Sequence, residues 1–417
     1  MPEPNRFLQG PFAPVEEEIT AFDLPVTGTL PAELNGRYLR NGPNPLGLDD
    51  PGYRFREGHW FLGPGMVHGV RLRGGKAEWY RNRWVHSQLL AEAMDEKWPA
   101  GPVHNDMDFA AHTKLDHATG ELHAIAYFWA WDHVEHVIIG AGGTLSRTTG
   151  IPVADGPMMH DFALTVSYVI LLDLPVTFSL DAVSAGLKLP YTWNPSHRAR
   201  VGLLPRDGTA AGVRWFEVDP CWVFHTLNAY DNGGRVVLDL VRYAGAYDVS
   251  TPTGPGSLTL DRWIIDPAAG KVTQQRLDDR PQEFPRTDER VTGRPHRYGY
   301  SAVIAAVGHA AVSPGGDFAD GAFSNALLKH DLTAGTVQAH EFGQDATAGE
   351  AVFCSRRPRR RRRRRLRHGL HPQPRPRRRR PGHPRRPGLH RRTHRPRPSA
   401  RPDPASTAAG SPTRRSA

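Results

Sequence analysis

The sequence predicts an all-β fold of the β-propeller type, and two observations lead to this prediction. Short segments rich in Val, Ile, Tyr and Trp recur between turn signals, among them ELHAIAYFWA, YVILLDL, VRWFEV, RVVLDLVRY and DRWIID. One kind of turn also recurs along the chain. Hairpins repeated over more than about 200 residues are typical of a propeller, in which each blade is a small antiparallel sheet. A two-sheet sandwich is the alternative, and the length of the chain argues against it.

The recurring turn has Asp four residues before Gly, with a predicted strand on each side. It occurs at Asp116–Gly120, Asp266–Gly270 and Asp331–Gly335. An Asp side chain can accept hydrogen bonds from the backbone that follows it, and Gly adopts positive φ without strain. Each of the three segments is therefore predicted to be a hairpin loop.

The charge of the chain is divided sharply at Cys354. The 417 residues contain 53 Lys and Arg against 43 Asp and Glu, but residues 354–417 hold 24 Arg and one acid, Asp403. The preceding 353 residues therefore carry a net charge of −13, and nothing in their charge favours specific binding of nucleic acid. We expect residues 1–353 to form the folded domain. Residues 354–417, rich in Arg and Pro and without hydrophobic periodicity, are expected to be disordered.

The compartment is predicted from two further features. Cys221 and Cys354 are the only cysteines, so the sequence indicates no disulfide framework. The first residues lack the basic and then apolar pattern of a secretory signal, and the longest apolar stretch is too short to span a bilayer. A cytoplasmic protein is the expectation.

Three histidines in the first 353 residues share a setting in which a turn meets a strand. They are His112 in FAAHTKLD, His160 in GPMMHDFALT and His225 in CWVFHTLNAYDN. A propeller would bring such positions together, since the inner strand of every blade lines the central axis, and converging neutral imidazoles can hold Fe, Zn or Cu. For any one histidine alone, a hydrogen-bonded core or surface role is the commoner explanation. No local His spacing strengthens the metal hypothesis.

A set of longer motifs resembles one protein family in content and order. The motifs include NGRYLRNGPNPL, HWFLGPGMVHGVRL, AHTKLDHATGELHA, PMMHDFALT, FHTLNAYDNG, RLDDRPQEFPRTDER and GEAVF. Together they resemble the carotenoid cleavage oxygenases, the family that includes the lignostilbene dioxygenases. The resemblance covers residues 5–353.

The resemblance implies a seven-bladed propeller with Fe(II) held on its axis by four histidines. His112, His160 and His225 match three of these ligands. Glu283 and Glu350 match carboxylates that accept a hydrogen bond from the second nitrogen of a ligand imidazole, an arrangement that fixes its tautomer and orientation.

The implied reaction is cleavage of a conjugated C=C bond by O₂ into two carbonyl products. The partners implied are O₂ and an apolar conjugated small molecule, with peripheral membrane contact as a route for its uptake. The aromatic stretches AYFWAWDHVEH and LKLPYTWNP are candidates to line a substrate tunnel, although buried aromatics more often fill a core. Two other functions stay open: a propeller that only binds, and a histidine–metal hydrolase that needs no O₂.

The sequence departs from the family pattern in three places. Pro64 stands where the family usually has an acidic residue. The chain also passes from GPVHNDMDFA directly to AHTKLD, where family members have additional strands, so part of a blade is expected to be missing near residue 110. Finally, the fourth histidine of the family, in a GFHG motif near the C-terminus, has no counterpart here. The last blade is therefore expected to be incomplete.

A shifted reading frame would account for the third departure. With suitable codons, residues 363–376 read one base later give DDGYVMAFIHNPD, and residues 405–413 read from the third base give FHGSWIPD, which contains the missing histidine. The two stretches need different frames, so at least two slips are required. The competing hypothesis is a real basic tail that binds polyanions without specificity, since no aromatic residues are interleaved to stack on bases.

Overall fold

The computed structural model describes residues 13–44, 64–86, 90–91, 94, 109–110, 112–185, 190–245, 258–304, 323–343 and 348–354. The chain divides into two units, Met1–Pro358 and Arg359–Ala417, and every described residue belongs to the first. Apart from Cys354, the predicted tail of residues 354–417 and its predicted disorder lie outside the described residues.

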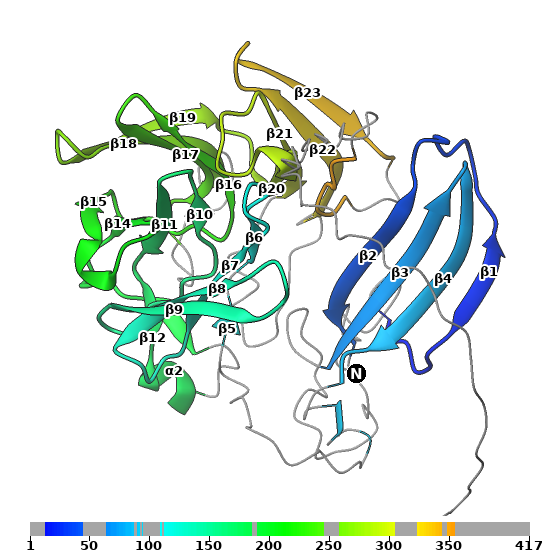
Figure 1. The fold of residues 1–417 in the computed structure, drawn as a ribbon, viewed down its shortest axis with the longest axis horizontal. Coiled ribbons are helices and arrows are strands. Elements are labelled where there is room, and N and C mark those ends of the chain that lie inside the picture. The colour runs from blue at the N-terminus through cyan, green and yellow to red at the C-terminus, as the bar shows by residue number, and fades with distance from the viewer. Residues whose placement is uncertain are drawn as a thin grey trace, which may run out of the picture. The chain divides into compact units, whose positions relative to one another are not determined.

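The described strands form five antiparallel sheets, numbered here in chain order, and one separate hairpin (Figure 1). Sheet 1 contains β1 (Thr20–Leu24), β2 (Gly36–Pro43), β3 (Gly65–Arg73) and β4 (Lys76–Trp84). Sheet 2 contains β5 (Phe109–Ala110), β6 (Lys114–Leu115), β7 (Leu122–Tyr127), β8 (His133–Ile139) and β9 (Leu145–Pro152). Sheet 3 contains β10 (Ala163–Leu164), β11 (Tyr168–Asp173), β14 (Arg200–Pro205) and β15 (Arg214–Glu217).

The two remaining sheets follow the same plan. Sheet 4 contains β16 (Thr226–Asn232), β17 (Arg235–Tyr243), β18 (Leu258–Asp266) and β19 (Lys271–Asp278). Sheet 5 contains β20 (Gln282–Arg286), β21 (Tyr298–Ile304), β22 (Phe323–Asp331) and β23 (Thr336–Glu341). The separate hairpin pairs β12 (Val176–Phe178) with β13 (Tyr191–Trp193), and the short helices are α2 (Leu180–Ser184), η3 (Ala210–Gly212) and η4 (Glu289–Val291).

The all-β prediction is confirmed, but the expected count of seven blades is wrong for the described part of the chain, which holds five blade-like sheets. The number seven was implied by the family resemblance and not by hairpins in this sequence. The loss of strands that the sequence predicts near residue 110 and after Phe353 would lower the count, and this loss stays a prediction.

The three predicted hairpin loops are confirmed. They join β6 to β7, β18 to β19 and β22 to β23. In each loop the Gly backbone N–H donates to the carbonyl of the Asp four residues earlier, at 2.7 to 2.9 Å, and the Gly φ lies between 65° and 80°. The Asp side chain also accepts a backbone N–H within each loop, as at Asp116, whose Oδ1 lies 2.7 Å from Ala118 N.

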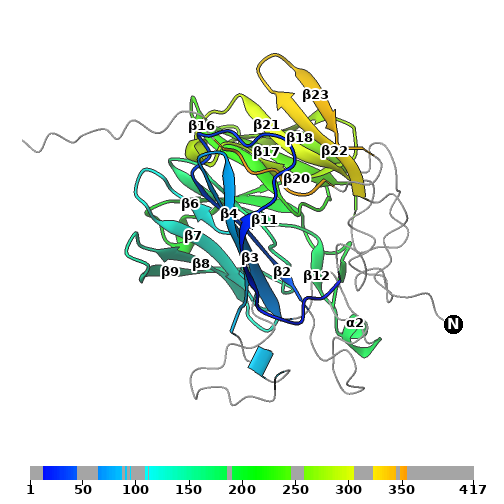
Figure 2. The ribbon, with the colours of Figure 1, turned by 90° about the vertical axis from the view of Figure 1, so that its right-hand side faces the viewer.

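Sheets 2 to 4 share one continuous apolar core, which includes Ile125, Leu171, Leu238 and Trp263. The first strands of successive sheets lie next to one another: β10 contacts β16, and β16 contacts β20 (Figure 1, Figure 2). Residues at the start of these strands are therefore brought close together although they are far apart in the sequence. Among the described residues, no helix has the length and apolar character needed to cross a membrane.

Candidate metal centre

The three predicted histidines lie at breaks or beginnings of the inner strands of sheets 2, 3 and 4. His112 lies between β5 and β6, two short strands that both pair with β7. His160 lies three residues before β10, and His225 directly precedes β16, whose pairing with β17 shifts register after Thr226. Irregular backbone at these points frees each imidazole from the alternation of a regular strand.

The structure brings the three imidazoles together. Nε2 of His112 lies 3.2 Å from Nε2 of His160 and 3.1 Å from Nε2 of His225. One nitrogen from each ring falls within 4.8 Å of the other two. Two imidazole nitrogens bound to one metal at about 2.1 Å and at a right angle would lie about 3.0 Å apart, so the separations suit a shared divalent ion.

Hydrogen bonding alone accounts poorly for this arrangement. An imidazole nitrogen carries either one proton or one lone pair, so Nε2 of His112 cannot form a separate good hydrogen bond with each of its two close neighbours. A cation at the centre of the three nitrogens would use all three lone pairs at once. The donor set therefore fits a transition metal that prefers nitrogen ligands.

Burial controls the protonation of two of these histidines. Desolvation, with a smaller contribution from the positive charge of His225, lowers the pKa of His112 to about 3. Desolvation also lowers the pKa of His160 well below its ordinary value, with His225 and His112 adding to the effect. Both imidazoles are therefore neutral at physiological pH, as a metal ligand must be.

His225 differs because a buried carboxylate contacts its second nitrogen. Nδ1 of His225 lies 2.7 Å from Oε2 of Glu283, whose side chain is fully buried. Burial alone would lower the pKa of His225, but the charge and hydrogen bond of Glu283 outweigh it and raise the pKa. The same contact engages Nδ1 of the ring while its Nε2 lies 3.1 Å from Nε2 of His112.

Two neighbours that the sequence did not single out position this carboxylate. The hydroxyl of Tyr243 donates to Oε1 of Glu283 at 2.9 Å, and the backbone N–H of Phe284 donates to Oε2. Phe284 has φ of 54°, an uncommon conformation for a bulky residue, and the pairing of β20 with β21 shifts register here. Strained backbone of this kind is held by its surroundings and is frequent at functional sites. No sequence signal marks Tyr243, because it lies in an ordinary apolar strand.

Glu350 is placed differently from Glu283. Its side chain is 42% exposed, and Oε1 lies 3.3 Å from Nη1 of Arg286. Within the described residues no hydrogen bond joins Glu350 to a histidine. The role that the resemblance implies for Glu350 stays a prediction, and the described partner of its carboxylate is an arginine.

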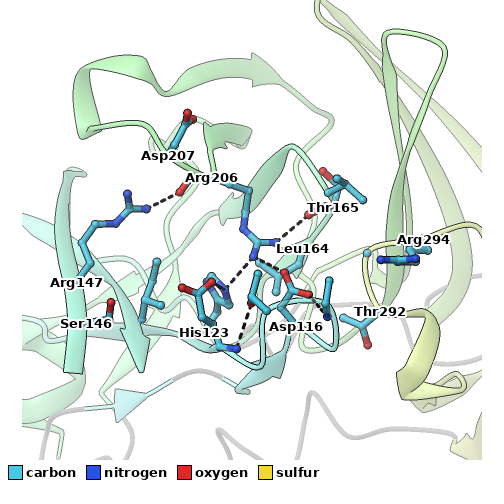
Figure 3. Close-up of a pocket in the computed structure, with 16 residues that line it drawn as sticks. Asp116, His123, Ser146, Arg147, Leu164, Thr165, Arg206, Asp207, Thr292 and Arg294 are labelled. Carbon is cyan, nitrogen blue, oxygen red and sulfur yellow. Dashed lines mark hydrogen bonds and ion pairs between the residues drawn. The ribbon is translucent and has the colours of Figure 1, made fainter. Parts of the chain in front are cut away.

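Two cavities lie near these elements, and the one beside His112 has a mainly polar lining. A cavity of about 360 Å³ is lined by His112, Lys114, Arg286 and other residues of β6, β10, β16 and β20. A second cavity, of about 450 Å³, contains none of the three histidines. Figure 3 shows Arg206 in this second cavity, where its guanidinium donates to Asp116, His123 and the carbonyl of Thr165.

The described residues of the two aromatic stretches that are candidates for a tunnel lining pack together. The rings of Trp129 and Phe178 stack with centroids 4.5 Å apart, and Tyr191, which is fully buried, lies edge-on to Tyr127 and Phe178. Neither cavity described above is lined by these residues. The core-filling role that the sequence left open describes them better.

An all-β fold of four- and five-stranded sheets, with an all-imidazole cluster gathered from successive inner strands, defines a propeller protein with a candidate metal centre. Comparison with known sequences identifies the family. Residues 12–102 and 96–364 match the sequence profile of the retinal pigment epithelial membrane protein family. A carotenoid cleavage oxygenase from Mycobacterium tuberculosis is 39% identical over 442 aligned positions, which cover 84% of this chain and 86% of the relative. The chain belongs to the carotenoid cleavage oxygenase family.

Solved structures support the fold. The lignostilbene dioxygenase of Pseudomonas brassicacearum superposes with a TM-score of 0.65 at 24% identity, covering 81% of this chain and 84% of that chain. A cobalt-substituted Synechocystis apocarotenoid oxygenase superposes with a TM-score of 0.65 at 23% identity, covering 82% of this chain and 85% of that chain. These likenesses confirm the propeller fold, and the cobalt-substituted relative is consistent with a metal-dependent family.

The alignment to the Mycobacterium tuberculosis relative is longer than the part of this chain that it covers. The aligned part of the chain is 84% of 417 residues, about 350, whereas the alignment to the Mycobacterium tuberculosis relative has 442 positions. About 90 positions of that relative therefore have no counterpart within the aligned region.

Proposed function

We propose that this protein is a non-haem Fe(II) dioxygenase that splits a conjugated C=C bond. One molecule of O₂ is consumed for each double bond, and the two carbons each become a carbonyl group, so atoms and electrons balance without another reductant. The observation that carries the proposal is the convergence of three imidazole nitrogens within 4.8 Å, in a chain that belongs to an oxygenase family.

The protein's own residues would act by holding and orienting. His112, His160 and His225 would supply the three nitrogens to the metal. Glu283 keeps Nδ1 of His225 engaged, so that Nε2 is the free nitrogen of that ring. When bound, the iron would activate O₂ for attack on the double bond. An all-imidazole shell, unlike one with a carboxylate ligand, leaves the ion its full 2+ charge.

The missing fourth histidine predicts a weakened centre. Three imidazoles can hold a divalent ion, but removal of one ligand from a four-ligand set lowers affinity and leaves an additional position open to water. We infer weak iron binding and low activity for the chain as written. The last strands of a propeller also close its ring, and an unpaired strand edge favours aggregation.

The test is reconstitution and product analysis. The protein is loaded with Fe(II) under argon, mixed with a stilbene or an apocarotenoid, and exposed to O₂, and aldehyde products are separated by chromatography. Low but iron-dependent and O₂-dependent aldehyde formation is expected, and it should be lost in His160→Ala. Products formed equally without O₂ would instead indicate a hydrolase, and folded protein that never binds metal would indicate a binding module. The family comparisons favour neither of these alternatives.

We further propose that residues after Phe353 are translated in a shifted frame. In support, the family profile ends at residue 364, within the arginine run. Resequencing the DNA from the codon of Phe353 to the stop tests this: a missing or extra base at each of two or more positions would restore the final strands and the fourth histidine. An unchanged sequence would mean a genuine arginine-rich extension.

The cellular setting follows from the same proposal. We infer a cytoplasmic protein whose apolar substrate is taken up by peripheral contact with a membrane. Cell fractionation with and without added vesicles tests both statements. Recovery of the protein in a periplasmic or secreted fraction would overturn the first, and lack of any vesicle binding would overturn the second.

A further inference from the structure

Beside each of the three histidines lies a polar residue, and these three polar residues contact one another. Lys114 follows His112 by two positions, and Asp161 and Thr226 directly follow His160 and His225. Nζ of Lys114 lies 2.8 Å from Oδ1 of Asp161. Oδ2 of Asp161 accepts the backbone N–H of Thr226 at 2.8 Å and its hydroxyl at 3.0 Å. We refer to these contacts as the Lys114–Asp161–Thr226 bridge.

The carboxylate at the centre of this bridge is fully buried and fully paired. Asp161 is 1% exposed, and its Oδ1 also accepts the backbone N–H of Phe162 at 2.8 Å. An ionised carboxylate at such a depth is costly unless a counter-charge and hydrogen bonds satisfy it. Four donor groups satisfy the carboxylate of Asp161: Nζ of Lys114, the backbone N–H and hydroxyl of Thr226, and the backbone N–H of Phe162. The first three belong to the segments that carry His112 and His225.

The bridge therefore joins sheets 2, 3 and 4 immediately beside the imidazole cluster. We propose that Lys114, Asp161 and Thr226 are positioning residues, which hold the three histidine segments at the separation that a metal ion requires. This inference rests on the proposed function, because it assumes that His112, His160 and His225 bind a metal. The bridge acts on the backbone of the segments, whereas Glu283 acts on one imidazole ring.

An ordinary stabilising ion pair is the competing explanation, and the molecule contains a matched example. Arg262 and Asp239 form an ion pair at 2.7 Å with side-chain exposures of 19% and 0%, against 19% and 1% for Lys114 and Asp161. Asp239 and Arg262 are, however, direct partners across β17 and β18 within sheet 4. Breaking either pair removes a similar buried interaction, but only one of them joins segments that carry the histidines.

The experiment compares three variants of the full chain by Co²⁺ titration. Lys114→Gln removes the charge of the bridge, Thr226→Val removes one hydroxyl while keeping the side-chain shape, and Arg262→Gln is the control. The dissociation constant and the visible absorption of bound Co²⁺ are measured at equal protein concentration. Circular dichroism and thermal unfolding establish that each variant is folded.

We expect Lys114→Gln to raise the Co²⁺ dissociation constant about 10- to 100-fold, as loss of groups that orient metal ligands generally does. Thr226→Val should raise it about threefold or more on the same reasoning, and both variants should alter the Co²⁺ absorption bands, which report ligand geometry. Arg262→Gln should lose thermal stability while its Co²⁺ affinity and spectrum stay those of the wild type.

Three results would overturn the inference. A folded Lys114→Gln variant with the Co²⁺ affinity and spectrum of the wild type would show that the bridge does not position the ligands. If Lys114→Gln does not fold, wild-type affinity and spectrum in Thr226→Val would show the same. An equal loss of Co²⁺ affinity in Arg262→Gln would show that any loss of stability weakens metal binding, so that the bridge has no special role. Wild-type protein that binds no Co²⁺ would overturn the proposed metal centre together with this inference, which distinguishes the two failures.

Discussion

Sheet 1 and sheets 2 to 4 are stabilised in different ways. Among the described residues, the apolar cluster at sheet 1 has Met66, Trp84 and Leu90 as its buried members, while Phe22 and Leu39 of the strands are 63% and 59% exposed. Sheets 2 to 4 instead share a continuous core that extends across all three sheets. The histidine cluster is thus built on the region whose sheets are fixed to one another by apolar burial.

Polar side chains take a larger share in sheet 1. Asn82 is fully buried, accepts the backbone N–H of Ile19 at 2.6 Å and donates to the carbonyl of Glu17 at 2.8 Å. Asn44 makes the same two contacts with Val15. Specific side-chain hydrogen bonds thus hold the segment that precedes β1, whereas sheets 2 to 4 are joined by a shared apolar core and, beside the histidines, by the Lys114–Asp161–Thr226 bridge. A metal site that needs separations accurate to a few tenths of an ångström depends on both kinds of support.

The largest expected effect tests the apolar core directly. Trp263 lies in β18 and is fully buried. We expect Trp263→Ala to lower the free energy of unfolding by about 3 to 5 kcal/mol, through lost burial and the cavity left behind. Phe22→Ala in sheet 1 should change it by less than about 0.5 kcal/mol, because the ring is already exposed. Urea unfolding followed by circular dichroism measures both, and equal losses would refute the contrast between the two regions.

A smaller effect is expected from the polar contacts of sheet 1. Asn82→Ala leaves the backbone N–H of Ile19 and the carbonyl of Glu17 without their partner, which should cost about 1 to 3 kcal/mol. The loss should appear as early hydrogen exchange of β1 and β4, with sheets 2 to 4 still protected. Uniform exchange throughout the molecule would show that sheet 1 is not independently supported.

The smallest expected change in stability concerns the ion pairs of His197, a buried residue in the region of sheets 2 to 4. His197 is 7% exposed, and its Nδ1 and Nε2 each lie 2.8 Å from a carboxylate oxygen, of Asp155 and Asp173 respectively. Burial alone would lower its pKa, but the two carboxylates outweigh burial and raise the pKa above 6.5. The stabilisation that His197 provides is therefore complete below the unfolded-state pKa of 6.5 and is lost as the pH rises through the raised folded-state value.

We therefore expect the stability difference between wild type and His197→Gln to be largest near about pH 5.5 and to shrink toward about pH 9. At its largest it should be on the order of 1 kcal/mol, the usual net contribution of a hydrogen bond. Asp155→Asn should show a weaker pH dependence, since one of the two carboxylates is removed. A difference that grows with rising pH would contradict the assignment of His197 as a doubly paired imidazolium.

The sequence predicted local turns from residue type and spacing, whereas the histidine cluster and the number of blades depended on the family resemblance. The Asp-to-Gly turns are local, so Asp266 and Gly270 could be assigned from spacing and side-chain chemistry alone. The convergence of His112, His160 and His225 required the family resemblance, because no short spacing links them. The predicted count of seven blades was wrong for the described residues, which form five sheets, because that number came from the family and not from hairpins in this sequence.

Other features depend on distances that no pattern in the sequence encodes. Lys114 and Asp161 are 47 positions apart, and nothing in either motif indicates that they meet. Glu350 and Arg286 are 64 positions apart, and neither of their motifs indicates the ion pair between them. Tertiary geometry, and not residue type, decides both contacts.

The most direct test of the central claim is X-ray absorption spectroscopy at the iron edge, on metal-free protein loaded under argon with one equivalent of Fe(II). Coordination by His112, His160 and His225 predicts about three imidazole nitrogens at roughly 2.1 Å, with water completing the shell, and one fewer imidazole in His225→Ala. An all-oxygen shell identical to that of the aqueous ion, unchanged in the variant, would contradict the metal centre.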